Sequence, residues 1–187
     1  ILYFAKKNYR NIVTINFAEE PKYKTITIDG YSADSIIKNI SLIDPNKRFL
    51  PFETLIFFDE LQEFPDIATS LKFFKIDGRF DIICSGSLLG THYKKIHSIS
   101  VGYKTDYEMY SLDFEEFLWA KGYDEHIQSI LDHMLEQKPF SEPQISIFNS
   151  LFLDYCVLGG MPAIVRSYIQ KGTFETSLKI QKQILLD

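Results

Sequence analysis

The feature that most constrains this chain is an apolar run that ends abruptly in two acids. Residues 55–58, LIFF, have the length and composition of a strand that is buried on both faces of a sheet. Asp59 and Glu60 follow this run directly. Two charged residues directly after a buried strand need an explanation, and the residues beyond the end of that strand are therefore candidates for a functional site.

Other strand-like segments alternate with helical patterns along the first part of the chain. Strands are predicted at residues 11–17, 55–58, 80–87 and 107–112. Residues 25–30 predict a short extended piece that an Asp-Gly turn closes. Helices are predicted between the strands, one capped by Ser32 and one beginning at Pro65. This alternation predicts an α/β fold with a mostly parallel sheet flanked by helices.

From residue 113 onward the patterns are all helical. Asp113 and Glu116 have the spacing of a capping box, and Gly159 and Gly172 are natural helix stops. Further helices are predicted at residues 125–137, 143–156, 162–171 and from 174 onward. The sequence thus predicts an α/β core over residues 1–112 and an all-helical region over residues 113–187.

Composition limits the classes of protein. The net charge is −5, which does not support a nucleic-acid footprint over the whole domain, and no apolar run approaches the length of a membrane span. The two cysteines, Cys84 and Cys156, form neither a disulfide framework nor a zinc pattern. A cytoplasmic protein with no membrane partner is the prediction.

Polar side chains follow two of the predicted strands at their carboxyl ends, where ligands of open α/β sheets bind. Asp59 and Glu60 end one strand, and Ser85 and Ser87 end another. In a magnesium nucleotide site, Asp59 would hold the ion directly or through water, and Glu60 would deprotonate the attacking water. A serine hydroxyl could sense the terminal phosphate. A helix cap or solvated turn is the alternative for the acids, and a tight turn for the serines.

The ordered segments FAKKNYRNIVTINFAEE, ETLIFFDELQE, FDIICSGSLLG, YEMYSLDFEEFLWAKG and VLGGMP resemble the prokaryotic AAA+-type P-loop ATPases that carry a further C-terminal domain. The resemblance covers nearly the whole chain and implies ATP and Mg²⁺ as ligands. It implies that LIFFDE is the Walker B strand, with Asp59 on the Mg²⁺ side and Glu60 as catalytic carboxylate. It makes Ser85 or, preferably, Ser87 the sensor, and the helical region a lid in which Arg166 reaches a phosphate.

The chain departs from this family in one respect: it contains no G-x-x-x-x-G-K-[ST] motif. We expect residues 1–187 to be an internal segment of a longer protein, with the central P-loop strand missing from the sheet. An unseen segment, a second copy or another chain would then complete the sheet, or the sheet closes in a different way. Without the P-loop cradle and lysine, we expect this segment alone not to hydrolyse ATP.

Two other functions remain open at this stage, so enzymatic activity is itself uncertain. The chain could be a non-catalytic nucleotide switch or interaction module. It could also be the ATPase portion of a protein that acts on nucleic acid, with Lys94 and Lys95 in a basic patch, although a solvated loop is the preferred explanation of these lysines. Residues 159–162, GGMP, are either a helix stop and restart or a hinge between core and lid.

Overall fold

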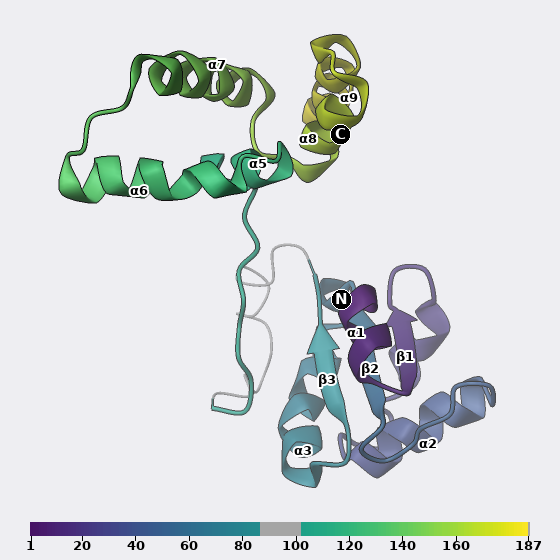
Figure 1. The fold of residues 1–187 in the computed structure, drawn as a ribbon. Helices are drawn as coiled ribbons and strands as arrows, with labels where there is room; N and C mark the ends of the chain where they lie inside the picture. The colour runs from purple at the N-terminus through teal and green to yellow at the C-terminus, as the bar shows by residue number, and fades with distance from the viewer. Residues whose placement is uncertain (87–101, 187) are drawn as a thin grey trace. The chain divides into compact units, whose positions relative to one another are not determined.

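The chain divides into two compact units, each with its own hydrophobic core (Figure 1). The computed structural model describes residues 1–86 and 102–186. The first unit is Ile1–Asp106 and the second is Tyr107–Asp187. Helices account for all the regular structure described in the second unit, which confirms the predicted fold class. The boundary after residue 112 and the role of the helices as a lid stay predictions.

In the described part of the first unit, three parallel strands form the sheet. They are β1 (Asn11–Asn16), β2 (Thr54–Asp59) and β3 (Asp81–Cys84), in the order β1-β2-β3. The register pairs Asn16 with Asp59, and Phe58 with Cys84. Because parallel strands run in one direction, the polar residues at their carboxyl ends gather at one edge of the sheet.

The helices of the first unit begin and end where the local chemistry requires. Among its described residues they are α1 (Leu2–Asn8), α2 (Ala33–Ile43) and α3 (Ser70–Asp77), with 3₁₀ turns at Pro21–Thr25, Leu61–Glu63 and Pro65–Thr69. The Ser32 hydroxyl accepts the Ser35 N–H at 3.2 Å, as a helix N-cap does. Gly78 ends α3 in the left-handed conformation that glycine adopts without steric cost.

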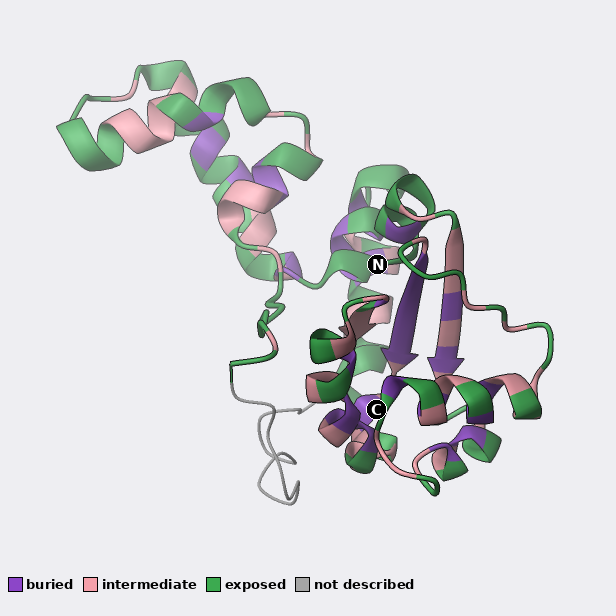
Figure 2. Cartoon of the chain, turned by 90° about the horizontal axis from the view of Figure 1, so that it is seen from below, coloured by how far each residue is buried: buried purple, intermediate pink, exposed green. Residues whose placement is uncertain are grey.

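Side chains of β2 are buried on both faces of the sheet, and this strand is almost entirely purple in Figure 2. Ile56 and Phe58 belong to the main core, to which α2 and α3 contribute Ile36, Ile40 and Phe74. Leu55 and Phe57 alternate onto the opposite face and are also buried, as is Ala5 of α1. Helices therefore cover both faces, which explains why this strand has no polar residue before Asp59.

β3 is the least buried strand and forms one edge of the sheet. Asp81 is exposed and Ile82, Ile83 and Cys84 are half-buried, whereas five of the six residues of β2 are buried. In the part of the chain that the structure describes, no strand pairs with the outer edge of β3. An edge of this kind presents backbone N–H and C=O groups that another strand can pair with.

The two cysteines differ in environment, and this gives a direct test of the packing around β3. Burial raises the pKa of the Cys84 thiol from its ordinary value near 9 to about 12, with Lys104 acting in the opposite direction. Cys156 is exposed on α7 (Glu142–Leu158). Because the thiolate is the reactive species and the Cys84 thiol is partly covered, we expect iodoacetamide at pH 8 to alkylate Cys84 at least about tenfold more slowly than the exposed Cys156. Peptide mass spectrometry over time measures both rates, and equal rates would contradict the burial of Cys84.

The second unit is built from five described helices. They are α5 (Phe114–Ala120), α6 (Ile127–Glu136), α7, α8 (Pro162–Lys171) and α9 (Phe174–Leu186). Its core contains Phe117, Leu118, Phe148, Leu151, Leu158, Ile164, Val165 and Tyr168. The predicted capping box is confirmed: Asp113 accepts the Glu116 N–H at 2.8 Å, and Glu116 accepts the Asp113 N–H at 3.0 Å.

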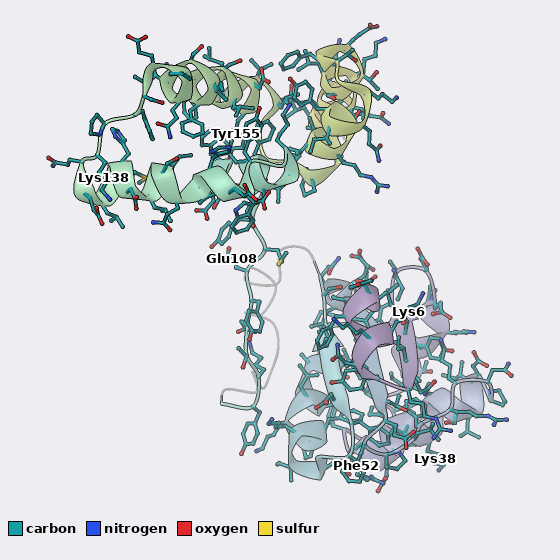
Figure 3. The ribbon with its side chains drawn as sticks, viewed as in Figure 1. Lys6, Lys38, Phe52, Glu108, Lys138 and Tyr155 are labelled. Carbon is teal, nitrogen blue, oxygen red and sulfur yellow. The ribbon has the colours of Figure 1, made fainter. Side chains whose placement is uncertain are left out.

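A close backbone contact fastens the start of α5 to the turn between α7 and α8. Leu112 N–H donates to the Gly160 carbonyl at 2.8 Å, and the Tyr155 hydroxyl donates to the Leu112 carbonyl at 2.9 Å. Tyr155 points between α7 and α5, where its ring contacts Phe114 and Phe117 (Figure 3). A Cβ at Gly160 would overlap the Leu112 carbonyl oxygen. The GGMP segment thus joins two helices inside one compact unit.

One strand prediction and the prediction of one short extended piece were wrong. Residues 107–112 form no strand, and Tyr107 and Tyr110 are 85% and 76% exposed. An extended segment becomes a strand only when another strand pairs with it, and none in the described chain does so. Residues 26–29 form turns after the 3₁₀ segment Pro21–Thr25, with Ile26 in the core and Ile28 81% exposed.

Candidate functional site

The polar residues at the carboxyl ends of all three strands meet around Asp59. Its Oδ1 accepts a hydrogen bond from the Ser85 hydroxyl, which follows β3, and from the Glu60 N–H at 3.1 Å. Its Oδ2 accepts from the Asn16 amide at 3.3 Å, at the end of β1. Asp59 is half-buried, so three donors satisfy a carboxylate that water reaches only in part. The structure therefore brings together Asp59 and Ser85, as the sequence predicted.

Asn16 was missed by the sequence reasoning. Its Oδ1 accepts the N–H groups of Ala18 and Glu19 at 2.9 and 3.0 Å, which fixes the amide so that its nitrogen faces Asp59. Its signal in the sequence is a polar residue that ends a strand, the same signal that identified Asp59. Recognising it requires the register, which places Asn16 opposite Asp59.

Glu60 has an unusual backbone conformation. Its φ and ψ are 55° and 49°, in the left-handed region that residues other than glycine rarely adopt. The chain turns sharply here from β2 into the 3₁₀ segment Leu61–Glu63, and the Gln62 amide donates to Glu60 Oε2. Residues other than glycine in this conformation are strained and persist only where the surrounding structure holds them. Such residues cluster at functional sites.

The other predicted site residues do not belong to the described part of the first unit. Ser87 lies outside the described residues, as do Lys94 and Lys95. Arg166 is exposed on α8 in the second unit, so its predicted contact with a phosphate stays a prediction.

The donor set around Asp59 suits Mg²⁺ better than a metal that proteins bind through many side chains. No cluster of three or more His, Cys, Asp or Glu side chains occurs among the residues described. Magnesium in nucleotide sites is held by one or two carboxylates, with substrate phosphates and waters completing its octahedron. Asp59 and the adjacent Glu60 provide carboxylates of this number, and the single hydrogen bond to Asp59 Oδ2 leaves that oxygen with capacity to accept a further ligand or a water.

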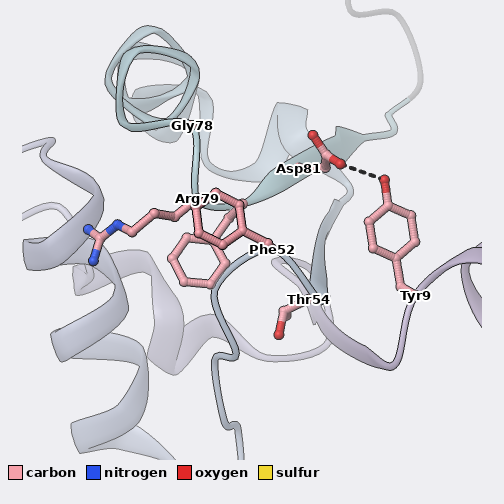
Figure 4. Close-up of a pocket in the computed structure, with 7 residues that line it drawn as sticks. Tyr9, Phe52, Thr54, Gly78, Arg79 and Asp81 are labelled. Carbon is pink, nitrogen blue, oxygen red and sulfur yellow. Dashed lines mark hydrogen bonds between the residues drawn. The ribbon is translucent and has the colours of Figure 1, made fainter.

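A small pocket lies at the opposite, amino end of the strands (Figure 4). It has a volume of about 100 Å³, below the size of a nucleotide site. The Tyr9 hydroxyl donates to Asp81 at 2.7 Å, and this bond raises the pKa of Tyr9 to about 12. Arg79 is paired with Asp77 at 2.7 Å and with Asp34. These polar groups satisfy one another, so the pocket is not the nucleotide site.

A three-stranded parallel sheet with helices on both faces, followed by helices, has the α/β architecture of P-loop NTPase-like proteins. A family model described as an AAA domain matches residues 1–118, and the chain belongs to this family. No curated protein and no solved structure gave a significant match. Membership indicates an ATPase-like domain and nucleotide binding at the level of the family. None of the helices that the structure describes is long and apolar enough to cross a membrane.

Proposed function

We propose that these residues are the Walker B half of an AAA-type site that binds ATP with Mg²⁺ and hydrolyses it. The observation that carries the proposal is Asp59, which Asn16 and Ser85 hold at the carboxyl edge of an AAA domain with Glu60 next to it. In this proposal, Asp59 holds the Mg²⁺ ion directly or through water, and Glu60 is the general base. In the proposed lid, Arg166 contacts a phosphate, and Ser87 or Ser85 senses the terminal phosphoryl group.

In this reaction, water attacks the γ-phosphorus and the bond to the β–γ bridging oxygen breaks, so that its electron pair leaves with ADP. Glu60 takes the proton that the attacking water loses. Asp59 would hold Mg²⁺ at this edge of the sheet, where the ion would supply positive charge that offsets the charge developing on the phosphates. Asn16 and Ser85 donate to Asp59 and so keep its carboxylate oriented toward the edge of the sheet.

Two partners follow from the proposal. Nucleotide is the first. A strand that pairs with the outer edge of β3 is the second, supplied by another part of the protein, by a second copy or by another chain. Residues 1–187 contain no P-loop motif, so alone they are expected to show no turnover of ATP.

The proposal is tested through the dependence of ATP turnover on Mg²⁺, in a form of the protein that includes a P-loop. Asp59→Asn is expected to raise the Mg²⁺ concentration for half-maximal turnover roughly 10–100-fold, because one metal-binding carboxylate is lost. Asp66→Asn is the matched control, since Asp66 is an exposed acid of the same unit that accepts from Thr27 and Tyr31. If the rate of ATP turnover depends neither on the Mg²⁺ concentration nor on the Asp59→Asn substitution, Asp59 does not have the proposed metal role.

A nucleotide switch without hydrolysis is the second candidate. The retained pair Asp59 and Glu60 favours hydrolysis, because a switch needs a metal ligand but no general base. Tight ATP binding with no phosphate release by the wild-type protein would favour the switch.

A further inference from the structure

A contact beside the proposed general base has no role in the site as described so far. The Gln62 side-chain amide donates to Oε2 of the Glu60 carboxylate, and both residues are half-buried. Glu60 and Gln62 lie beyond the end of β2, and neighbouring side chains of a regular α-helix are three or four residues apart, not two. This contact therefore depends on the particular backbone of the turn.

The turn is held in place from several sides. Leu61 is 1% exposed, and its N–H donates to the Ser85 carbonyl at 3.0 Å. Glu63 N–H donates to the Glu60 carbonyl at 2.9 Å, and Phe64 N–H to the Leu61 carbonyl at 3.1 Å. These bonds fix the left-handed conformation of Glu60, which brings Gln62 back beside the carboxylate. The same Leu61 to Ser85 bond ties the turn to the serine that contacts Asp59.

An amide donor on one oxygen of a carboxylate affects how the group acts as a base. It fixes the plane of the carboxylate, and it leaves Oε1 as the oxygen that takes a proton from water. General-base catalysis requires this orientation, because the base must lie within hydrogen-bond reach of the proton that it abstracts. We propose that Gln62 is a positioning residue that orients Glu60 for proton abstraction. This inference rests on the proposed function of Glu60.

The test separates kcat, KM and the pH profile of ATP turnover in the form that includes a P-loop. Gln62→Met keeps the length of the side chain and removes the donor, so kcat is expected to fall at least about tenfold while KM stays within about twofold. Gln62→Glu places a second carboxylate beside Glu60. Because two adjacent carboxylates do not ionise together easily, the acidic limb of the kcat profile is expected to move up by about one pH unit or more.

Glu63→Gln is the matched control in the same turn. Glu63 faces solvent and pairs with Lys24 at 3.1 Å, so this change is expected to leave kcat within about twofold of wild type. kcat is referred to the folded fraction, measured by circular dichroism, so a purely structural role for Gln62 would leave kcat per folded molecule within about twofold of wild type. If Glu60→Gln abolishes turnover while both Gln62 variants behave like wild type, the inference fails and the proposed function stands. If Glu60→Gln retains wild-type turnover, the proposed role of Glu60 fails first.

Discussion

Glu60→Gln is expected to lower kcat for ATP hydrolysis about 10²–10⁴-fold, because the amide cannot take the proton of the attacking water. Glutamine has nearly the same size and can keep the contact with Gln62, so the turn should survive the change. The affinity for ATP should stay within about threefold, since the variant retains Asp59 and its three donors. Phosphate release and binding of a fluorescent ATP analogue measure the two quantities.

Glu53→Gln is the matched control for this experiment. Glu53 precedes β2 at its amino end and pairs with Arg10 at 3.1 Å on the surface, so its loss should change kcat by no more than about twofold. A Glu60→Gln protein that releases phosphate at the wild-type rate would show that another group is the base. A variant that loses binding together with turnover would point to a structural role.

Gly160→Ala is expected to destabilise the helical unit by roughly 2–4 kcal/mol, through overlap with the Leu112 backbone and loss of the hydrogen bond between the two residues. The methyl group cannot be relieved by a rotamer change, because the atom that it meets is a backbone carbonyl. Thermal unfolding followed by circular dichroism at 222 nm measures the effect.

Gly172→Ala is the control for the glycine itself. Gly172 ends α8 with φ of 67° and has nothing within 4 Å of a built Cβ, so alanine there meets only the left-handed strain of about 1–2 kcal/mol. If the two variants lose equal stability, the contact between Leu112 and Gly160 contributes nothing beyond conformational preference.

The sequence predicted those parts of the fold that depend on local pattern. The β2 strand was recognisable because burial on both faces demands continuous apolar residues, and the helices because caps such as Ser32 and Asp113 are local signals. The strand predicted at residues 107–112 was wrong, because strand formation depends on a partner that pattern alone does not reveal. The extended piece predicted at residues 25–30 was also wrong. Its apolar residues do not share an environment, because Ile26 packs in the core and Ile28 is exposed in a turn.

The site residues that could be predicted are the polar residues that directly follow a strand in the sequence. Asp59 and Ser85 lie together because parallel strands finish at one edge, which alternation of strands and helices predicts. Asn16 required the strand register, and Gln62 required the left-handed turn at Glu60, neither of which is visible in a linear pattern. The missed residues are thus those whose position is decided by backbone geometry.

The bond between Leu112 and Gly160 also has a consequence for the order of events during synthesis. The start of α5 is completed by a residue that leaves the ribosome only after α6 and α7 have been made. The rings of Phe114 and Phe117 in α5 likewise become covered only after Tyr155 has been synthesised. We therefore expect the helical unit to acquire its native structure late and in one step, after α7 has emerged, while its earliest helix stays exposed to chaperones and proteases.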